Sequence, residues 1–239
     1  MDRYTRRELK QDEYQNVYQE FERFAKTHYK QILGVVGALI VVAGIGTGLK
    51  LYMDRQEAAA NADLGAALQT FHAYVGPPSQ NIGLALTFTT AREKYKKALT
   101  QFSDLARKYP RQKAGEIARY HIGVCQSGLG DHASAIKTLE AAEHTSDANI
   151  AALAKLALAG EYASTGKLAE AEKLYQDLAD HPTLTVPKAT ALMALASADR
   201  ASNPAKSRQI YEGLLADKDL SANNSLVADL KEQLSDLPK

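Results

Sequence analysis

The feature that most constrains this chain is an uncharged run near its start. Nineteen residues without a charged side chain lie between Lys30 and Lys50, and ten of them are Leu, Ile or Val. On a membrane-insertion scale these ten contribute about −3 to −6 kcal/mol. Residues 32–49 would form a helix about 27 Å long, close to a hydrocarbon core of about 30 Å. We therefore interpret residues 31–52 as a transmembrane helix.

Two other interpretations of this run fit less well. The core helix of a soluble protein keeps a polar stripe, whereas this run offers only Gln31 and Thr47. A signal peptide has a short basic start and an apolar region of about 7–15 residues, whereas thirty residues precede this run. The stretch EAAANAD (57–63) resembles a cleavage site but continues a helical pattern. We expect an uncleaved signal anchor.

The distribution of basic residues predicts the orientation of the anchor. Residues 1–30 contain seven Lys or Arg, and residues 50–70 contain only Lys50 and Arg55. Basic residues favour the cytoplasmic side, so the N-terminus is expected in the cytoplasm and the rest of the chain outside the inner membrane.

Three glycines on one face of the anchor would let another helix approach closely. They are Gly37, Gly44 and Gly48.

The first thirty residues have the pattern of an amphipathic helix. Thr5 and Glu8 form a capping box, and apolar residues then recur on one helical face. This face is either a docking surface for a membrane partner or a surface that contacts only lipid. The apolar residues are Tyr14, Val17, Tyr18, Phe21, Phe24 and Ala25.

Beyond the anchor, the composition predicts a neutral helical domain. Residues 50–239 carry 22 basic and 22 acidic side chains, which leaves no electrostatic footprint for nucleic acid. Gly and Pro are infrequent, and Ala, Leu, Lys and Glu are common, as in helices. The single cysteine, Cys125, has no partner for an intramolecular disulfide.

A repeat of thirty-six residues organises this domain. Gly130 and Gly166 occupy the same place in two units, and so do the pairs Ala135 and Ala171, and Leu139 and Tyr175. Each glycine is expected to end a first helix, and each alanine to let a second helix pack closely on it. Such hairpins bury their apolar faces only by stacking, so the repeat predicts an all-α solenoid. Ser207 and Tyr211 continue the pattern downstream, and Ala98 and Phe102 precede it.

These units resemble the tetratricopeptide repeat over about residues 88–217. The third unit departs, because Ser202 replaces the turn glycine and Ser207 the packing alanine. Residues 220–237 are expected to form a capping helix. The expected parts are a cytoplasmic amphipathic helix (1–30), the anchor (31–52), a membrane-proximal helix and linker (53–87) and the repeat domain with its cap (88–239). The matching residues are Ile122, Gly123, Gly130, Ala135 and Leu139, then Leu158, Ala159, Tyr162, Gly166, Ala171, Tyr175 and Pro182.

The resemblance implies a concave groove lined by the first helices. The groove residues carry no Lys or Arg, so a grip on a peptide's carboxylate tail is not expected. An apolar groove suits an amphipathic or unfolded protein segment, although the chain's own residues 54–75 could fill it instead. The expected groove residues are Ile117, Tyr120, Val124, Leu153, Leu156, Ala163 and Leu192.

The sequence contains little that predicts catalysis. His121 and Cys125 lie four residues apart and could share a helical face, but no third metal ligand is placed beside them. No phosphate-binding loop or nucleophile elbow is present. We expect no enzymatic activity, no cofactor and no small-molecule substrate. A metal-binding or redox enzyme centred on His121 and Cys125 is the less favoured alternative.

The layout of a short basic N-terminus, one anchor and a helical-repeat domain resembles the ancillary subunits of the bacterial Sec translocon. That resemblance implies a bacterial inner-membrane protein with a periplasmic repeat domain. It also implies three kinds of protein partner, namely the SecYEG channel, a membrane-anchored periplasmic chaperone and client polypeptides. A second possibility is an envelope scaffold for cell division or polymer export.

Overall fold

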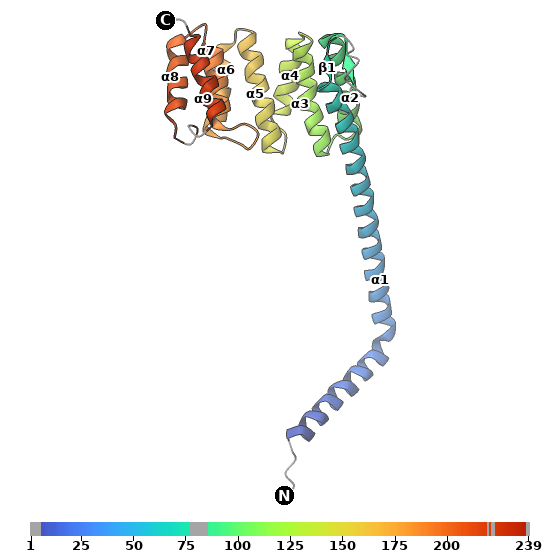
Figure 1. Cartoon of the computed structure of the whole chain (residues 1–239). Coiled ribbons are helices and arrows are strands. Elements are labelled where there is room, and N and C mark those ends of the chain that lie inside the picture. The colour runs from blue at the N-terminus through green and yellow to red at the C-terminus, as the bar shows by residue number, and fades with distance from the viewer. Residues whose placement is uncertain (1–5, 77–85, 219, 221–222, 238–239) are drawn as a thin grey trace. The chain divides into compact units, whose positions relative to one another are not determined.

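The computed structural model describes residues 6–76, 86–218, 220 and 223–237, with side chains from Glu22 onward except Ala25 and Ile32. The fold is all-α, apart from strands β1 (Tyr74–Val75) and β2 (Thr87–Phe88), which pair in parallel (Figure 1). The helices are α1 (Arg6–Phe71), α2 (Ala91–Lys108), α3 (Lys113–Gly128), α4 (His132–Ala142), α5 (Ala148–Ser164), α6 (Leu168–Asp180), α7 (Lys188–Asp199), α8 (Pro204–Ala216) and α9 (Asn224–Ser235).

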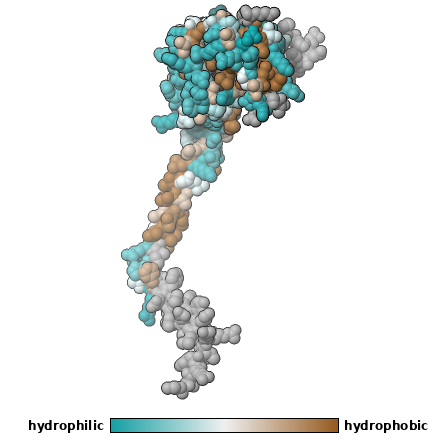
Figure 2. All heavy atoms as spheres, turned by 90° about the vertical axis from the view of Figure 1, so that its left-hand side faces the viewer, coloured by the Kyte–Doolittle hydropathy of each residue, from teal (hydrophilic) through white to brown (hydrophobic). Residues whose placement is uncertain are grey.

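The chain divides into two compact units, residues 1–56 and 57–239. Among the described residues, one helix is long and apolar enough to cross a membrane, and none of its apolar window is buried. Leu33, Ile40 and Val42 are 66–72% exposed, and Figure 2 shows this stretch as a continuous hydrophobic surface. An apolar surface of this kind is stable only when lipid or another protein covers it.

The first unit bears on two further predictions. Nothing lies within 4 Å of the position that a Cβ would take at Gly37, Gly44 or Gly48. The face predicted for helix pairing is therefore open. The side chains of residues 6–21 and Ala25 lie outside the described residues, and with them most of the predicted amphipathic face.

In the second unit, α2 to α8 lie side by side in sequence order, and each contacts the next (Figure 1). Gly130, which follows α3, has φ +81, a left-handed conformation that only glycine adopts easily. Its N–H donates to the Ser127 carbonyl at 2.8 Å, and the Asp131 N–H donates to the Gln126 carbonyl at 2.9 Å. These two bonds form a Schellman motif, and the same motif recurs at Gly166 after α5. Both predicted turns are confirmed.

The repeat register is also confirmed by burial. Ala98, Ala135, Ala171 and Ser207 are at most 1% exposed. One helical turn later, the predicted gap-filling residues are at most 5% exposed; they are Phe102, Leu139, Tyr175 and Tyr211. Serine replaces alanine in the last hairpin without leaving a buried donor unpaired, because the Ser207 hydroxyl donates to the Ala196 carbonyl at 2.5 Å.

This close packing predicts the effect of a larger side chain at one of these positions. Ala171 of α6 packs in a cluster with Ala159 of α5 and Leu195 of α7. Ala171→Leu adds volume to this closed contact and should lower the free energy of unfolding by about 1–3 kcal/mol. Ala169→Leu is the matched control, because Ala169 lies exposed on the same helix. Equal unfolding midpoints for the two variants would contradict the packing described here.

The predicted boundary between a membrane-proximal segment (53–87) and a repeat domain (88–239) differs from the structure. Ala60, Leu64 and Ala67 of α1 are buried in one cluster with residues of α2 and α3. The segment 57–71 is therefore the first helix of a hairpin whose second helix is α2. Two of these three residues are small alanines, which give a weak apolar periodicity, and the connection between the two helices spans residues 72–90. The weak periodicity and the long connection made this hairpin difficult to recognise from the sequence.

The membrane-proximal helix predicted within residues 53–87 ends at Phe71. Tyr74 and Val75 instead form β1, which pairs with β2. The Gly76 N–H extends this pairing by donating to the Phe88 carbonyl at 2.9 Å. The two ends of the long connection are thereby held together.

The predicted capping helix corresponds to α9. Leu230 of α9 and Leu237 beyond it are 0% and 4% exposed, and they pack in one cluster with Ala196 of α7 and Tyr211 of α8. An Arg200 Nη donates to the Asp236 carbonyl at 2.9 Å and joins the end of α7 to the end of α9. α9 therefore covers apolar side chains of the last hairpin, as a solenoid cap does.

Candidate protein-binding surfaces

The seven residues predicted to line a groove are all half-buried. Six of them pack against buried clusters between helices in the part of the chain that the structure describes. Ile117 packs on the cluster of α1, α2 and α3, and Tyr120 on the cluster that holds Leu139 and Leu158. The others that pack in this way are Leu153, Leu156, Ala163 and Leu192. Each of these side chains is partly buried against the core and partly exposed to solvent. The predicted groove therefore exposes less apolar surface to a ligand than the residue types alone suggest.

The chain's own residues 54–75 do not fill the whole of the predicted groove. The buried side chains of this segment pack only in the cluster with α2 and α3. Leu153, Leu156 and Leu192 belong to other clusters. The segment therefore lies in the helical stack, and the α5 and α7 part of the predicted surface is not covered by it.

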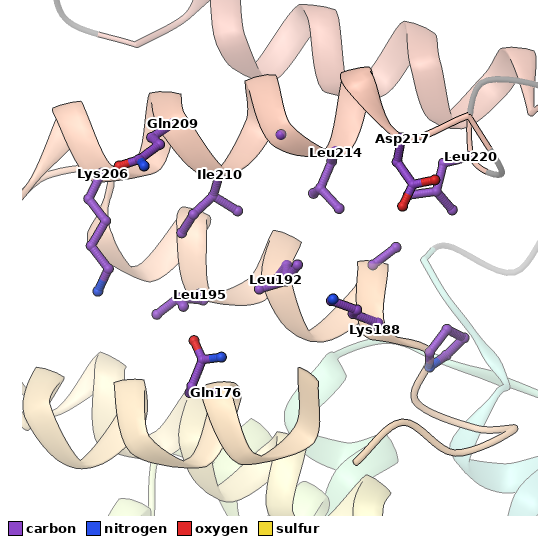
Figure 3. Close-up of a pocket in the computed structure, with 13 residues that line it drawn as sticks. Gln176, Lys188, Leu192, Leu195, Lys206, Gln209, Ile210, Leu214, Asp217 and Leu220 are labelled. Carbon is purple, nitrogen blue, oxygen red and sulfur yellow. The ribbon is translucent and has the colours of Figure 1, made fainter. Parts of the chain in front are cut away.

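A pocket of about 530 Å³ lies on a surface that the sequence did not indicate, between α6, α7 and α8 (Figure 3). Its apolar residues come from α7 and the residue that precedes it, from α8 and from the segment after α8. Leu192 is the one residue of the predicted groove among them. Polar side chains surround this apolar surface. The apolar residues are Pro187, Ala189, Leu192, Leu195, Ile210, Leu214 and Leu220, and the others are Gln176, Lys188, Lys206, Gln209, Gly213 and Asp217.

The two lysines of the pocket differ in their surroundings. Lys206 Nζ lies 2.8 Å from Asp199 Oδ2 and 2.7 Å from Glu172 Oε1. Burial acts to lower the pKa of Lys206, but its hydrogen bonds to the two carboxylates outweigh burial and raise the pKa. Lys188 is exposed and has no ion pair among the described residues. Lys188 is therefore the cation in this pocket that is available to a ligand.

No protein-family model, curated protein or solved structure matches this chain.

His121 and Cys125, the candidate metal or redox pair, lie in an apolar setting. The His121 ring stacks on Phe102 with centroids 4.7 Å apart and meets Phe71 edge-on at 5.0 Å. Burial, with a smaller electrostatic contribution from the neighbouring His72, lowers the pKa of His121 to about 4. Burial raises the pKa of the Cys125 thiol to about 12, which keeps it protonated. Among the described residues no group of three or more His, Cys, Asp and Glu could hold a metal ion.

The lowered pKa of His121 predicts a pH-dependent stability. As pH falls below about 6.5, the unfolded chain binds a proton at this imidazole before the folded chain does. The contribution of the neutral His121 to the free energy of unfolding should therefore be fully present above that pH. It should decline by on the order of 2 kcal/mol as the pH falls toward 4. His121→Phe should remove this decline, as measured by unfolding midpoints across the pH range. His144→Phe, at a side chain that is 80% exposed, should leave the decline in place.

Sequence reasoning missed a buried carboxylate. Glu161 of α5 is only 7% exposed, and its two oxygens face two different helices. The Ser127 hydroxyl of α3 donates to Oε1, and His132 Nδ1 of α4 lies 2.8 Å from Oε2. Both partners bind the same carboxylate, so the trio joins neighbouring hairpins. The sequence signal was the position of Glu161, thirty-six residues after the buried Cys125.

Proposed function

We propose that this protein is a non-enzymatic, membrane-anchored protein-binding module. The main support for the proposal is that one chain contains both a helix able to span a membrane and a stack of α-hairpins. Stacked hairpins present extended surfaces that bind other polypeptides. The ionisable groups that sequence reasoning singled out, His121 and Cys125, are held neutral by burial.

In its most specific form, the proposal is an ancillary factor at the bacterial Sec translocon. The support is the resemblance in layout and the excess of Lys and Arg before the anchor, which favours a cytoplasmic N-terminus and a periplasmic helical unit. The unit would then assist exported or membrane proteins outside the inner membrane. Its partners would be the channel, a membrane-anchored chaperone or the client polypeptide.

Site-specific photo-crosslinking in cells tests this proposal. A photoreactive residue at Tyr120 or Leu156 of the full chain should yield adducts with translocon subunits, a periplasmic chaperone or exported polypeptides. Lys173, exposed on α6, serves as the background position. Adducts with cell-division or polymer-export components alone would favour the scaffold alternative, and the absence of specific adducts would count against a protein-binding role for this surface.

A further inference from the structure

The pocket between α6, α7 and α8 has no role in the fold described so far. We propose that it binds an amphipathic helix of a partner protein, which inserts its apolar face and places an acidic residue beside Lys188. The inference rests on the proposed function and deepens it, because it assigns the binding surface and the class of segment that the surface recognises.

The glycine in the wall of the pocket is the first observation that supports this proposal. Gly213 lies inside α8, where glycine costs up to about 1 kcal/mol relative to alanine. Nothing lies within 4 Å of the position that a Cβ would take there. At Gly123 and Gly128, by contrast, a Cβ would lie 2.6 Å from a neighbouring side chain. Packing among the described residues therefore explains why Gly123 and Gly128 are glycines, but it does not explain Gly213. Because Gly213 has no side chain, it leaves the α8 backbone accessible to a ligand.

The arrangement of the pocket residues on α8 indicates an elongated ligand. They recur at spacings of three and one residues from Lys206 to Asp217, the residue that caps the end of α8, which places them on one face of the helix. This face extends about 16 Å along the helix axis, or three turns. Leu192 and Leu195 of α7 lie beside it (Figure 3), and Ala189 of α7 also lines the pocket. An apolar groove along a helix of this length suits the apolar face of another helix.

The charged residues at the ends of the pocket indicate which charge the ligand should carry. Lys206, at one end, is neutralised by Asp199 and Glu172. At the other end, Asp217 already has an interaction within the chain, whereas Lys188 has no ion pair among the described residues. The unmatched charge is therefore positive and lies at the α7 start, where an acidic residue of the ligand would complement it.

The test uses a photoreactive peptide and the full chain in lipid nanodiscs. The peptide is an amphipathic helix of about 14 residues, or four turns, with leucines at i, i+3, i+4 and i+7 and a glutamate at each end. One leucine is replaced by photo-leucine, so that the crosslinked protein residues identify the binding surface. A scrambled peptide of the same composition, which has no continuous apolar face, measures non-specific labelling.

Crosslinks are expected on α7 and α8 within the pocket. Gly213→Leu fills the open space and should reduce labelling at least about tenfold, a loss of about 1.4 kcal/mol. Gly213→Ala, the matched control, adds one methyl group and should reduce labelling less. Both substitutions improve helix propensity, so the melting temperature should stay the same or rise. Undiminished labelling of the Gly213→Leu variant would overturn the proposal.

Charge reversal tests the role of Lys188. Lys188→Glu should weaken labelling by the glutamate peptide, and a peptide with lysines in place of the glutamates should restore it. Lys173→Glu, on the exposed surface of α6, should do neither. Labelling confined to the surface around Tyr120 and Leu156, or equal labelling by the scrambled peptide, would overturn the pocket assignment. The proposed function is judged separately, by the adducts formed in cells.

Discussion

Gly115→Ala is expected to destabilise the helical unit by about 3 kcal/mol or more, at the upper end of the range for overpacking. Gly115 lies in the first turn of α3, and a Cβ there would lie 1.9 Å from the Tyr109 carbonyl oxygen. The carbonyl carbon would be 3.0 Å away. These are backbone atoms, which cannot rotate aside as a side chain can. The turn between α2 and α3 would have to move, and with it the contact between two hairpins.

Denaturant unfolding of the full chain, followed by helical circular dichroism, would measure this effect. Gly65→Ala is the matched control, because Gly65 is an exposed helical glycine with nothing within 4 Å of the position that its Cβ would take. The control should raise stability by up to about 1 kcal/mol through helix propensity. If Gly115→Ala behaved like the control, the close approach of Tyr109 to α3 would be wrong.

The double substitution Val41→Arg and Ile45→Arg should release the protein from the membrane. The ten Leu, Ile and Val residues of the anchor together favour insertion by about 3 to 6 kcal/mol, and each arginine near the helix centre costs about 2.5 to 3.5 kcal/mol. Two arginines on one helical face therefore offset the whole gain. Val41 and Ile45 are 60% and 59% exposed, so the change does not disturb a protein core.

Fractionation of cells followed by alkaline carbonate extraction measures this release. The double arginine variant should appear in the soluble fraction or be degraded, whereas Val41→Leu with Ile45→Leu should stay in the membrane pellet. A double arginine variant that resists carbonate as the parent chain does would show that another segment holds the protein in the membrane.

The repeat could be predicted from the sequence because it depends on local requirements. Gly130 and Gly166 are needed wherever a helix ends in a left-handed residue, and Ala135 and Ala171 wherever two helices approach closely. Such requirements recur at a fixed interval, so they are visible without a structure. The apolar anchor is visible for a similar reason, since its length matches the thickness of a bilayer.

Features that depend on contacts between distant residues could not be predicted in this way. The hairpin of residues 57–71 with α2 is closed across a connection of nineteen residues (72–90), and the buried side chains of its first helix include the small Ala60 and Ala67. The Glu161 contacts join three helices. The pocket combines one residue of α6 with several residues of α7 and α8, which come together only in the folded stack. Leu192 was therefore assigned to a groove along the first helices, although it lines the pocket between α6 and α8.

Protease treatment of intact spheroplasts tests most directly whether a membrane-spanning helix holds the helical unit outside the inner membrane. Added protease should remove residues 57–239 and leave a short membrane-bound fragment that includes the N-terminus. A cytoplasmic protein in the same sample should remain intact. A helical unit that is protected in intact spheroplasts and digested only after lysis would contradict the proposed topology, and with it the periplasmic partners.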